Sequence, residues 1–168
     1  IPKLKECRYH LNSAPASHKE EAEKSMIFLT EGDSAAGTIT KSRNSDYQAI
    51  FALRGKILNV QGKNRTEIYK NEELYNMMIA LGIEESIENL RYGKVVIATD
   101  ADVDGFHIRI LIMTYFFTYF EELIEQGRLY ILETPLFRVR NKKENCYCYS
   151  EDERDEAIKK IKGAEVTR

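Results

Sequence analysis

The sequence has few cysteines and no long hydrophobic run, and both absences narrow the class of protein. Its three cysteines, Cys7, Cys146 and Cys148, form no C-x-x-C pair and are odd in number, so they indicate neither a disulfide framework nor a complete zinc site. We therefore expect a reducing, cytoplasmic setting. The longest uncharged run, Ile110 to Phe120, is far shorter than the roughly 20 residues of a transmembrane helix, so we expect no membrane partner.

Internal repeats and low-complexity segments are also absent, and the net charge is only −2. A chain of 168 residues with 43% hydrophobic residues is typical of a compact soluble domain, with room for a small appendage. The charge is nevertheless uneven. Basic residues gather between Lys41 and Arg65, and a second cluster follows later: Arg138, Arg140, Lys142 and Lys143. Basic clusters of this kind beside an acidic metal site would suit a polyanionic substrate.

Three aspartates follow a short apolar run in the middle of the chain. Val95 to Ala98 predicts a buried strand, and Asp100, Asp102 and Asp104 come directly after it, before Gly105. Open α/β sheets bind ligands at the carboxyl ends of their strands. Crowded carboxylates repel one another unless a cation compensates, and their oxygen atoms suit Mg²⁺ or Ca²⁺. The pattern therefore predicts a cation site.

Two better-known loops with similar spacing do not fit. A calcium-binding EF-hand that starts at Asp100 requires Glu at its twelfth position, which is Leu111 here. A phosphate-binding P-loop framed by Gly32 and Gly37 requires Lys and Ser or Thr next, but the residues that follow are Thr38-Ile39. The calcium loop is therefore rejected, and we do not expect a nucleotide-binding P-loop.

The remaining elements predict an α/β fold with a largely parallel sheet. A second strand, Ser25 to Thr30, ends at Glu31, so two strands that end in acids could lie side by side. Further strands are expected at 48–53 and 129–132, helices at 66–81 and 107–124, a hairpin around 141–144, and a last helix from the Ser150-x-x-Glu153 capping pattern to 162. The helix at 107–124 is so apolar that we expect it to be buried.

Glu31 at one strand end and Asp100-x-Asp102-x-Asp104 at another resemble the signature of the Toprim domain. The segments Glu31-Gly-Asp-Ser-Ala-Ala-Gly37, Leu53-Arg-Gly-Lys-Ile-Leu-Asn59 and Thr99-Asp-Ala-Asp-Val-Asp-Gly-Phe-His-Ile-Arg109 are similar to the B subunits of bacterial type IIA topoisomerases, gyrase and topoisomerase IV. Ala36 stands where many members have Gly. The context of Ser42-Arg43 and the stretch from Phe137 to Lys143 resemble topoisomerase IV, particularly of the Bacteroidetes type, more than gyrase.

The resemblance implies a Rossmann-like sheet flanked by helices, with a small hairpin-and-helix appendage. It divides the chain into a connecting arm from an absent N-terminal region (1–24), the Toprim core (25–134), and C-terminal strands and a helix that lead into absent family sequence (135–168). The start at Ile1 without methionine and the end at Arg168 agree with an excised piece.

The family's chemistry is Mg²⁺-dependent cleavage and rejoining of double-stranded DNA. The resemblance implies two Mg²⁺ ions, replaceable in binding by Mn²⁺ or Ca²⁺, held by Glu31, Asp100 and Asp102, with Asp104 as an outer neighbour. Glu31 would also act as acid or base. The nucleophilic tyrosine would come from the A subunit, in a heterotetramer of two A and two B subunits, and ATP would bind only in the absent N-terminal region. Lys56, Asn59 and His107 match positions that contact DNA in the family. Asp33 and Arg54 match the neighbourhood where quinolone sensitivity is determined.

Three alternatives stay open beside this interpretation. The B subunit of gyrase shares the same motifs. A phosphatase of the haloacid dehalogenase type would use Asp100 as nucleophile, but it would leave Glu31 without a role. Finally, the isolated fragment, which lacks the ATPase region and the tyrosine-bearing A subunit, would be inactive in catalysis and serve only as a module that binds Mg²⁺ and DNA.

Overall fold

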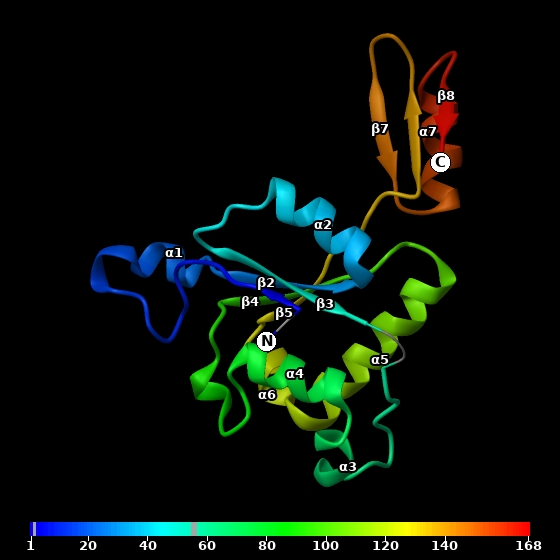
Figure 1. The fold of residues 1–168 in the computed structure, drawn as a ribbon. Coiled ribbons are helices and arrows are strands. Elements are labelled where there is room, and N and C mark those ends of the chain that lie inside the picture. Colours follow the sequence, from blue (N-terminus) through cyan, green and yellow to red (C-terminus); the bar gives the residue numbers. More distant parts are fainter. Residues whose placement is uncertain (2, 55–56) are drawn as a thin grey trace. The chain divides into compact units, whose positions relative to one another are not determined.

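The computed structural model describes residues 1, 3–54 and 57–168. The chain divides into two compact units, Ile1–Leu132 and Glu133–Arg168. The first unit is a sheet with helices on both faces, and the second is a small antiparallel sheet with one helix (Figure 1).

The sheet of the first unit has five strands in the order β1-β3-β2-β4-β5. Their bounds are β1 Leu4–Lys5, β2 Met26–Glu31, β3 Gln48–Leu53, β4 Lys94–Ala98 and β5 Leu129–Ile131. Strands β3, β2, β4 and β5 run parallel to their neighbours, and only the edge strand β1 is antiparallel. Parallel strands covered on both faces are read in sequence as continuous apolar runs. The predicted α/β fold with a largely parallel sheet is confirmed.

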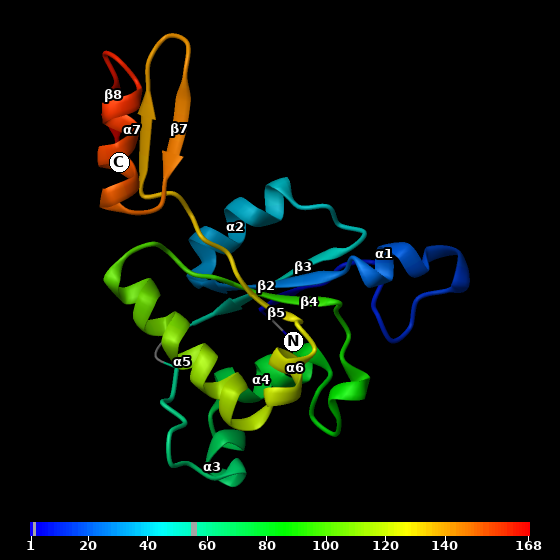
Figure 2. The same ribbon diagram turned by 180° about the vertical axis from the view of Figure 1, so that it is seen from behind.

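Helices cover the two faces of this sheet. The α-helices are α1 Lys19–Glu23, α2 Gly32–Ser42, α3 Arg65–Tyr69, α4 Glu72–Leu81, α5 Val103–Tyr119 and α6 Glu121–Glu125, with short 3₁₀ turns at Ala16–His18 and Ile87–Asn89. Helix α2 lies over one face, and α4, α5 and α6 lie over the other (Figure 2). On the α2 face, Ala36 belongs to a small cluster with Ile50 and Ala52.

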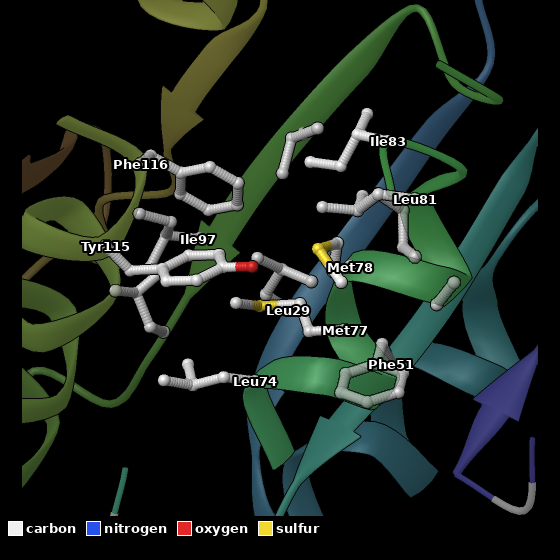
Figure 3. Packing of buried hydrophobic residues seen from close by; sticks show 14 of the residues in the cluster. Leu29, Phe51, Leu74, Met77, Met78, Leu81, Ile83, Ile97, Tyr115 and Phe116 are labelled. Carbon is white, nitrogen blue, oxygen red and sulfur yellow. The ribbon is translucent and has the colours of Figure 1, made fainter. Parts of the chain in front are cut away.

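The main core lies between the sheet and the helices α4 and α5 (Figure 3). Leu29 and Ile97 come from the two central strands, and Met77 and Phe116 from the helices, and all four are fully buried. Complete burial of a side chain of this size contributes roughly 1.5–3 kcal/mol to the free energy of unfolding. This packing holds β2 and β4 as neighbours. The residues at the ends of these two strands therefore lie near one another.

Two helices differ from their predicted bounds because polar caps were overlooked. The helix expected at 66–81 is two helices, since Asn64 accepts a hydrogen bond from the Glu67 amide and Asn71 accepts one from the Leu74 amide, each starting a helix of its own. The predicted end at Gly82 is confirmed, with φ of 74°. The helix expected at 107–124 begins earlier, at Val103, and is interrupted at Phe120, so that it consists of α5 and α6.

The expectation that this apolar helix is buried holds for one side of it only. Leu111, Ile112, Tyr115 and Phe116 are buried, but Phe106, Ile110 and Phe117 are 57%, 44% and 54% exposed. One side of α5 packs on the core, and the other side faces outward. A sequence that is apolar at every helical position does not reveal which side that will be.

Part of the segment expected to be a connecting arm joins the first unit. Strand β1 pairs with β3, and Cys7 is buried in the main core. Glu6 accepts hydrogen bonds from Arg91 and from the Tyr92 hydroxyl and pairs with His10, so one carboxylate ties this segment to the turn before β4.

The second unit is the predicted hairpin and helix with one additional strand. Strands β6 (Phe137–Arg140), β7 (Asn145–Cys148) and β8 (Glu165–Thr167) form an antiparallel sheet in the order β7-β6-β8, and α7 spans Glu151–Lys160. Its small core contains Val139, Cys148, Ala157 and Ile161. Ser150 caps α7 as predicted, accepting from the Glu153 amide. In the described part of the chain, no helix has the length and hydrophobicity needed to traverse a bilayer.

Candidate metal centre at the ends of two parallel strands

The carboxyl ends of β2 and β4 bring together residues that are far apart in sequence. The two strands are parallel neighbours, and their register pairs Thr30 with Ala98. Glu31 is the last residue of β2, and Asp100 follows two residues after the end of β4. Both acids therefore lie at the same edge of the sheet, where α/β proteins bind their ligands.

Glu31 has a carboxylate that the fold itself does not use. Helix α2 starts at Gly32, whose φ of +69° suits glycine, and Glu31 occupies the N-cap position without making a side-chain cap bond. Its Oε2 atom is buried and has no hydrogen-bond partner among the described residues. Buried polar atoms without a partner are rare and costly, so this oxygen is suited to a ligand.

The electrostatic surroundings of Glu31 are strongly negative. Burial, and then the charges of Asp100, Asp102 and Asp104, raise the pKa of Glu31 above its ordinary value of 4.5. Repulsion of this kind requires that the carboxylates lie near one another. A cation bound among them would remove that repulsion.

Asp102 also has a structural role that the sequence interpretation missed. It is the N-cap of α5, and its Oδ1 accepts a hydrogen bond of 2.7 Å from the Gly105 amide. An aspartate at this position satisfies a free helix amide and complements the positive end of the helix dipole. The cap engages Oδ1 of Asp102, whereas its second carboxylate oxygen takes no part in this bond. The signal for this cap was weak, because the predicted helix began at 107, five residues after Asp102.

Gly105 allows helix α5 to approach Asp100 closely. A Cβ atom at this position would lie 2.1 Å from the Asp100 carbonyl oxygen, closer than any real contact. The glycine after the aspartates thus holds the start of α5 against the loop that carries them.

The donor set fits Mg²⁺ in chemistry and in charge, since it consists of carboxylate oxygens with an unpartnered oxygen on Glu31. However, within the part of the chain that the structure describes, no three His, Cys, Asp or Glu side chains are grouped closely enough to hold a metal ion. The carboxylates of Glu31, Asp100 and Asp102 would therefore have to reorient to coordinate one.

The other predicted site residues are Asp33, Arg54, Asn59, His107 and Lys56. Asp33 and Arg54 contact each other in a two-pronged ion pair with Nη2 to carboxylate distances of 2.8 and 3.0 Å. His107 is exposed in α5, whereas the Oδ1 atom of Asn59 accepts from the Gln61 amide in a turn. Lys56 lies outside the described residues.

Two further residues near the aspartates had no role in the sequence interpretation. Thr99 directly precedes Asp100, and its hydroxyl is buried without a hydrogen-bond partner among the described residues. Arg109 lies one turn after Gly105 in α5, and its Nε atom is likewise buried without a hydrogen-bond partner among the described residues. Both are the end residues of the segment from Thr99 to Arg109 that carries the family resemblance, and that position was the available signal.

Comparison with known proteins places the site in a family context. A family profile described as "Toprim domain" matches residues 26–134. The chain is 64% identical to the B subunit of DNA topoisomerase 4 from Borreliella burgdorferi over its whole length, which is 28% of that relative. It is 45% identical to the B subunit of DNA gyrase from Cytophaga aurantiaca, covering 85% of this chain and 32% of the relative. The greater similarity to the topoisomerase IV protein agrees with the predicted order, whereas the Bacteroidetes attribution stays a prediction.

A solved structure supports the same fold. The DNA-binding, cleavage and re-ligation domain of Plasmodium falciparum topoisomerase II superposes with a TM-score of 0.79 at 26% sequence identity, covering 99% of this chain and 23% of that one. The chain thus spans about a quarter to a third of the proteins that it matches.

Proposed function

Because the chain belongs to the Toprim family, and because its relatives include topoisomerase IV and gyrase B subunits, we propose that it is the Mg²⁺-dependent DNA cleavage and religation domain of a topoisomerase IV B subunit. The observation that carries this proposal is the placement of Glu31 and Asp100 at one sheet edge, with a buried Glu31 oxygen that lacks a partner.

Each acid has a distinct task on this proposal. Glu31 and Asp100 would hold one Mg²⁺, and Asp100 and Asp102 would hold a second. A Mg²⁺ ion at this edge would supply stabilisation of the negative charge that develops on the leaving 3′-oxygen. Glu31, whose pKa is raised by burial and by the neighbouring aspartates, would exchange a proton with the 3′-hydroxyl as the strand is cut and rejoined. Asp104 contributes negative charge from outside the ligand set.

The rest of the reaction requires parts that lie beyond this chain. The proposal assigns the nucleophilic tyrosine to an A subunit, in a heterotetramer of two A and two B subunits, and ATP binding to sequence that precedes this domain. Lys56, Asn59 and His107 contact duplex DNA, and Asp33 with Arg54 forms the neighbourhood of quinolone binding. The enzyme acts in the cytoplasm.

The direct test is DNA cleavage by the B subunit reconstituted with its A subunit over a Mg²⁺ titration. Glu31→Gln keeps the shape of the side chain but removes its charge, so we expect cleavage to fall by roughly a hundredfold or more, the usual cost of losing a general acid or base. The matched control is Glu84→Gln, which neutralises an exposed acid and should cleave normally. Wild-type cleavage by Glu31→Gln at low Mg²⁺ would overturn the proposal.

The B subunit of gyrase is the second candidate, favoured by the 45% identity to such proteins. The two enzymes differ in the products of the full heterotetramer. We expect decatenation without the introduction of negative supercoils, and ATP-dependent negative supercoiling of relaxed plasmid would assign the chain to gyrase instead.

A further inference from the structure

The second unit separates its charges between two ends. Three acids, Glu151, Asp152 and Glu153, occupy the first turn of α7, and Lys159 and Lys160 occupy its last turn. This arrangement within the helix is explained by its dipole. The helix dipole does not explain the further basic residues that other segments bring to the lysine end.

Those residues come from two segments that meet in space. The turn between β6 and β7 carries Lys142 and Lys143, and the segment after α7 carries Lys162. The Asn141 side chain joins them, since its Nδ2 donates to the Lys162 carbonyl at 3.0 Å while its Oδ1 accepts from the amides of Lys143 and Glu144. The turn is thereby held against the end of the helix.

A hollow of about 590 Å³ opens at this junction. Its lining carries four cationic side chains, Arg140, Lys142, Lys143 and Lys162, against a single acid, Glu165. Glu165 is 3.9 Å from Arg140, which is only a loose ion pair. The three lysines are exposed and form no ion pair with any described residue. The hollow therefore has a surplus of positive charge that the unit itself does not neutralise.

We propose that this lysine-rich end of the second unit binds the phosphate backbone of duplex DNA, as a contact separate from the carboxylate site. The proposal rests on the proposed function for the identity of the polyanion. Lysine ammonium groups bind phosphates as point charges and do not read bases by themselves. The contact is therefore independent of sequence and metal and strongly dependent on salt.

The geometry favours a nucleic acid over an isolated small anion. The cations are spread over the turn between β6 and β7 and the segment after α7. They therefore match a row of phosphates better than one phosphate group. The open face of the sheet continues the basic surface, since Arg138 and Arg140 alternate on β6 with the buried Val139. Arg138 also stacks near the exposed Tyr147 ring at 5.7 Å.

The test measures binding of the whole 168-residue chain to short DNA duplexes of two unrelated sequences, in EDTA, over a series of KCl concentrations. The variant Lys142→Gln/Lys162→Gln removes one cation from each segment. We expect weaker binding to both duplexes, with the slope of log K against log[salt] reduced by about two units, one for each lost phosphate contact.

Two matched variants keep the result interpretable. Lys19→Gln/Lys70→Gln removes the same charge from exposed lysines of the first unit and should leave the slope nearly unchanged. Lys142→Arg/Lys162→Arg keeps the charge and should bind as the wild type does. Thermal unfolding checks that each variant is folded, which we expect because all four positions are exposed.

An unchanged slope for Lys142→Gln/Lys162→Gln overturns the proposal, and so does an equal loss in the Lys19/Lys70 variant. An unchanged DNA slope together with lost binding to polyglutamate overturns it in favour of an acidic protein segment. Glu31→Gln tests the cleavage proposal separately, since in EDTA it should keep the salt slope of the wild type. Normal cleavage by that variant would therefore leave the lysine result standing.

Discussion

At the scale of single residues, Asp102 serves both a helix and the candidate metal site, and two substitutions separate these roles. Asn caps a helix about as well as Asp does, so Asp102→Asn should leave the free energy of unfolding within about 0.5 kcal/mol of wild type, whereas Asp102→Ala should lower it by about 1 kcal/mol. Both should impair Mg²⁺-dependent cleavage, because both remove a carboxylate. Urea unfolding and cleavage assays measure the two effects. Full cleavage by Asp102→Asn would leave Asp102 as a helix cap alone.

Glu6 makes a prediction about acid stability. Burial would raise the pKa of Glu6, but its hydrogen bond with His10 and its pairing with Arg91 outweigh burial and lower the pKa from 4.5 to about 2. Because the unfolded chain has the higher pKa, the stabilisation from Glu6 is complete above about pH 4.5 and is lost as the pH falls toward 2. Its side chain is 43% exposed, so solvent screening limits the contribution to no more than about 1 kcal/mol.

The measurement is urea unfolding of wild type and Glu6→Gln across this acid range. The variant should be less stable at neutral pH and should lose less stability on acidification. Parallel pH profiles for the two proteins would show that Glu6 does not contribute through its charge.

At the scale of elements, the start of α5 depends on Gly105. Alanine there gains about 1 kcal/mol in helix propensity, but its Cβ would meet the Asp100 carbonyl oxygen at 2.1 Å. Gly105→Ala should therefore destabilise the unit by roughly 1–3 kcal/mol, the usual cost of overpacking, and should displace the aspartate loop. Thermal unfolding and Mg²⁺-dependent cleavage would both report it.

Gly37→Ala is the matched control for this substitution. Gly37 lies inside α2, and a Cβ there would have no neighbour within 4 Å, so alanine should stabilise the protein by about 0.5–1 kcal/mol. Equal stabilities for the two alanine variants would contradict the close packing of α5 against Asp100.

Helices and strands were predictable where a pattern of apolar residues defines them. They were less predictable where a polar cap determines the residue at which a helix begins. The strand at 48–53 is found at the predicted residues, because its apolar run is flanked by polar segments. The break between α3 and α4 depends on single hydrogen bonds from Asn64 and Asn71, which hydrophobic periodicity does not register. The strand β8 is three exposed residues, Glu165–Thr167, and it exists because β6 offers a free edge. Pairing of that kind is a tertiary effect.

At the scale of the whole molecule, the order of the strands creates the candidate site. Sequence reasoning could place Glu31 and Asp100 at strand ends, and the neighbouring parallel strands β2 and β4 bring those ends together. The arrangement of the carboxylates around a cation was beyond that reasoning, because it depends on side-chain rotamers and on the ion itself. Likewise, the Asp102 cap is a local hydrogen bond that the metal interpretation overlooked.

The central claim is that Glu31 and Asp100 share one Mg²⁺, and a double-mutant cycle on Mg²⁺ affinity tests it most directly. Calorimetric titration of the chain with Mg²⁺ would compare wild type, Glu31→Gln, Asp100→Asn and the double variant. We predict that each single substitution weakens the site by roughly tenfold or more, or about 1.4 kcal/mol, and that the double variant loses much less than the sum, since a shared ion is lost only once. Fully additive losses, or unchanged affinity in Glu31→Gln, would contradict a shared metal.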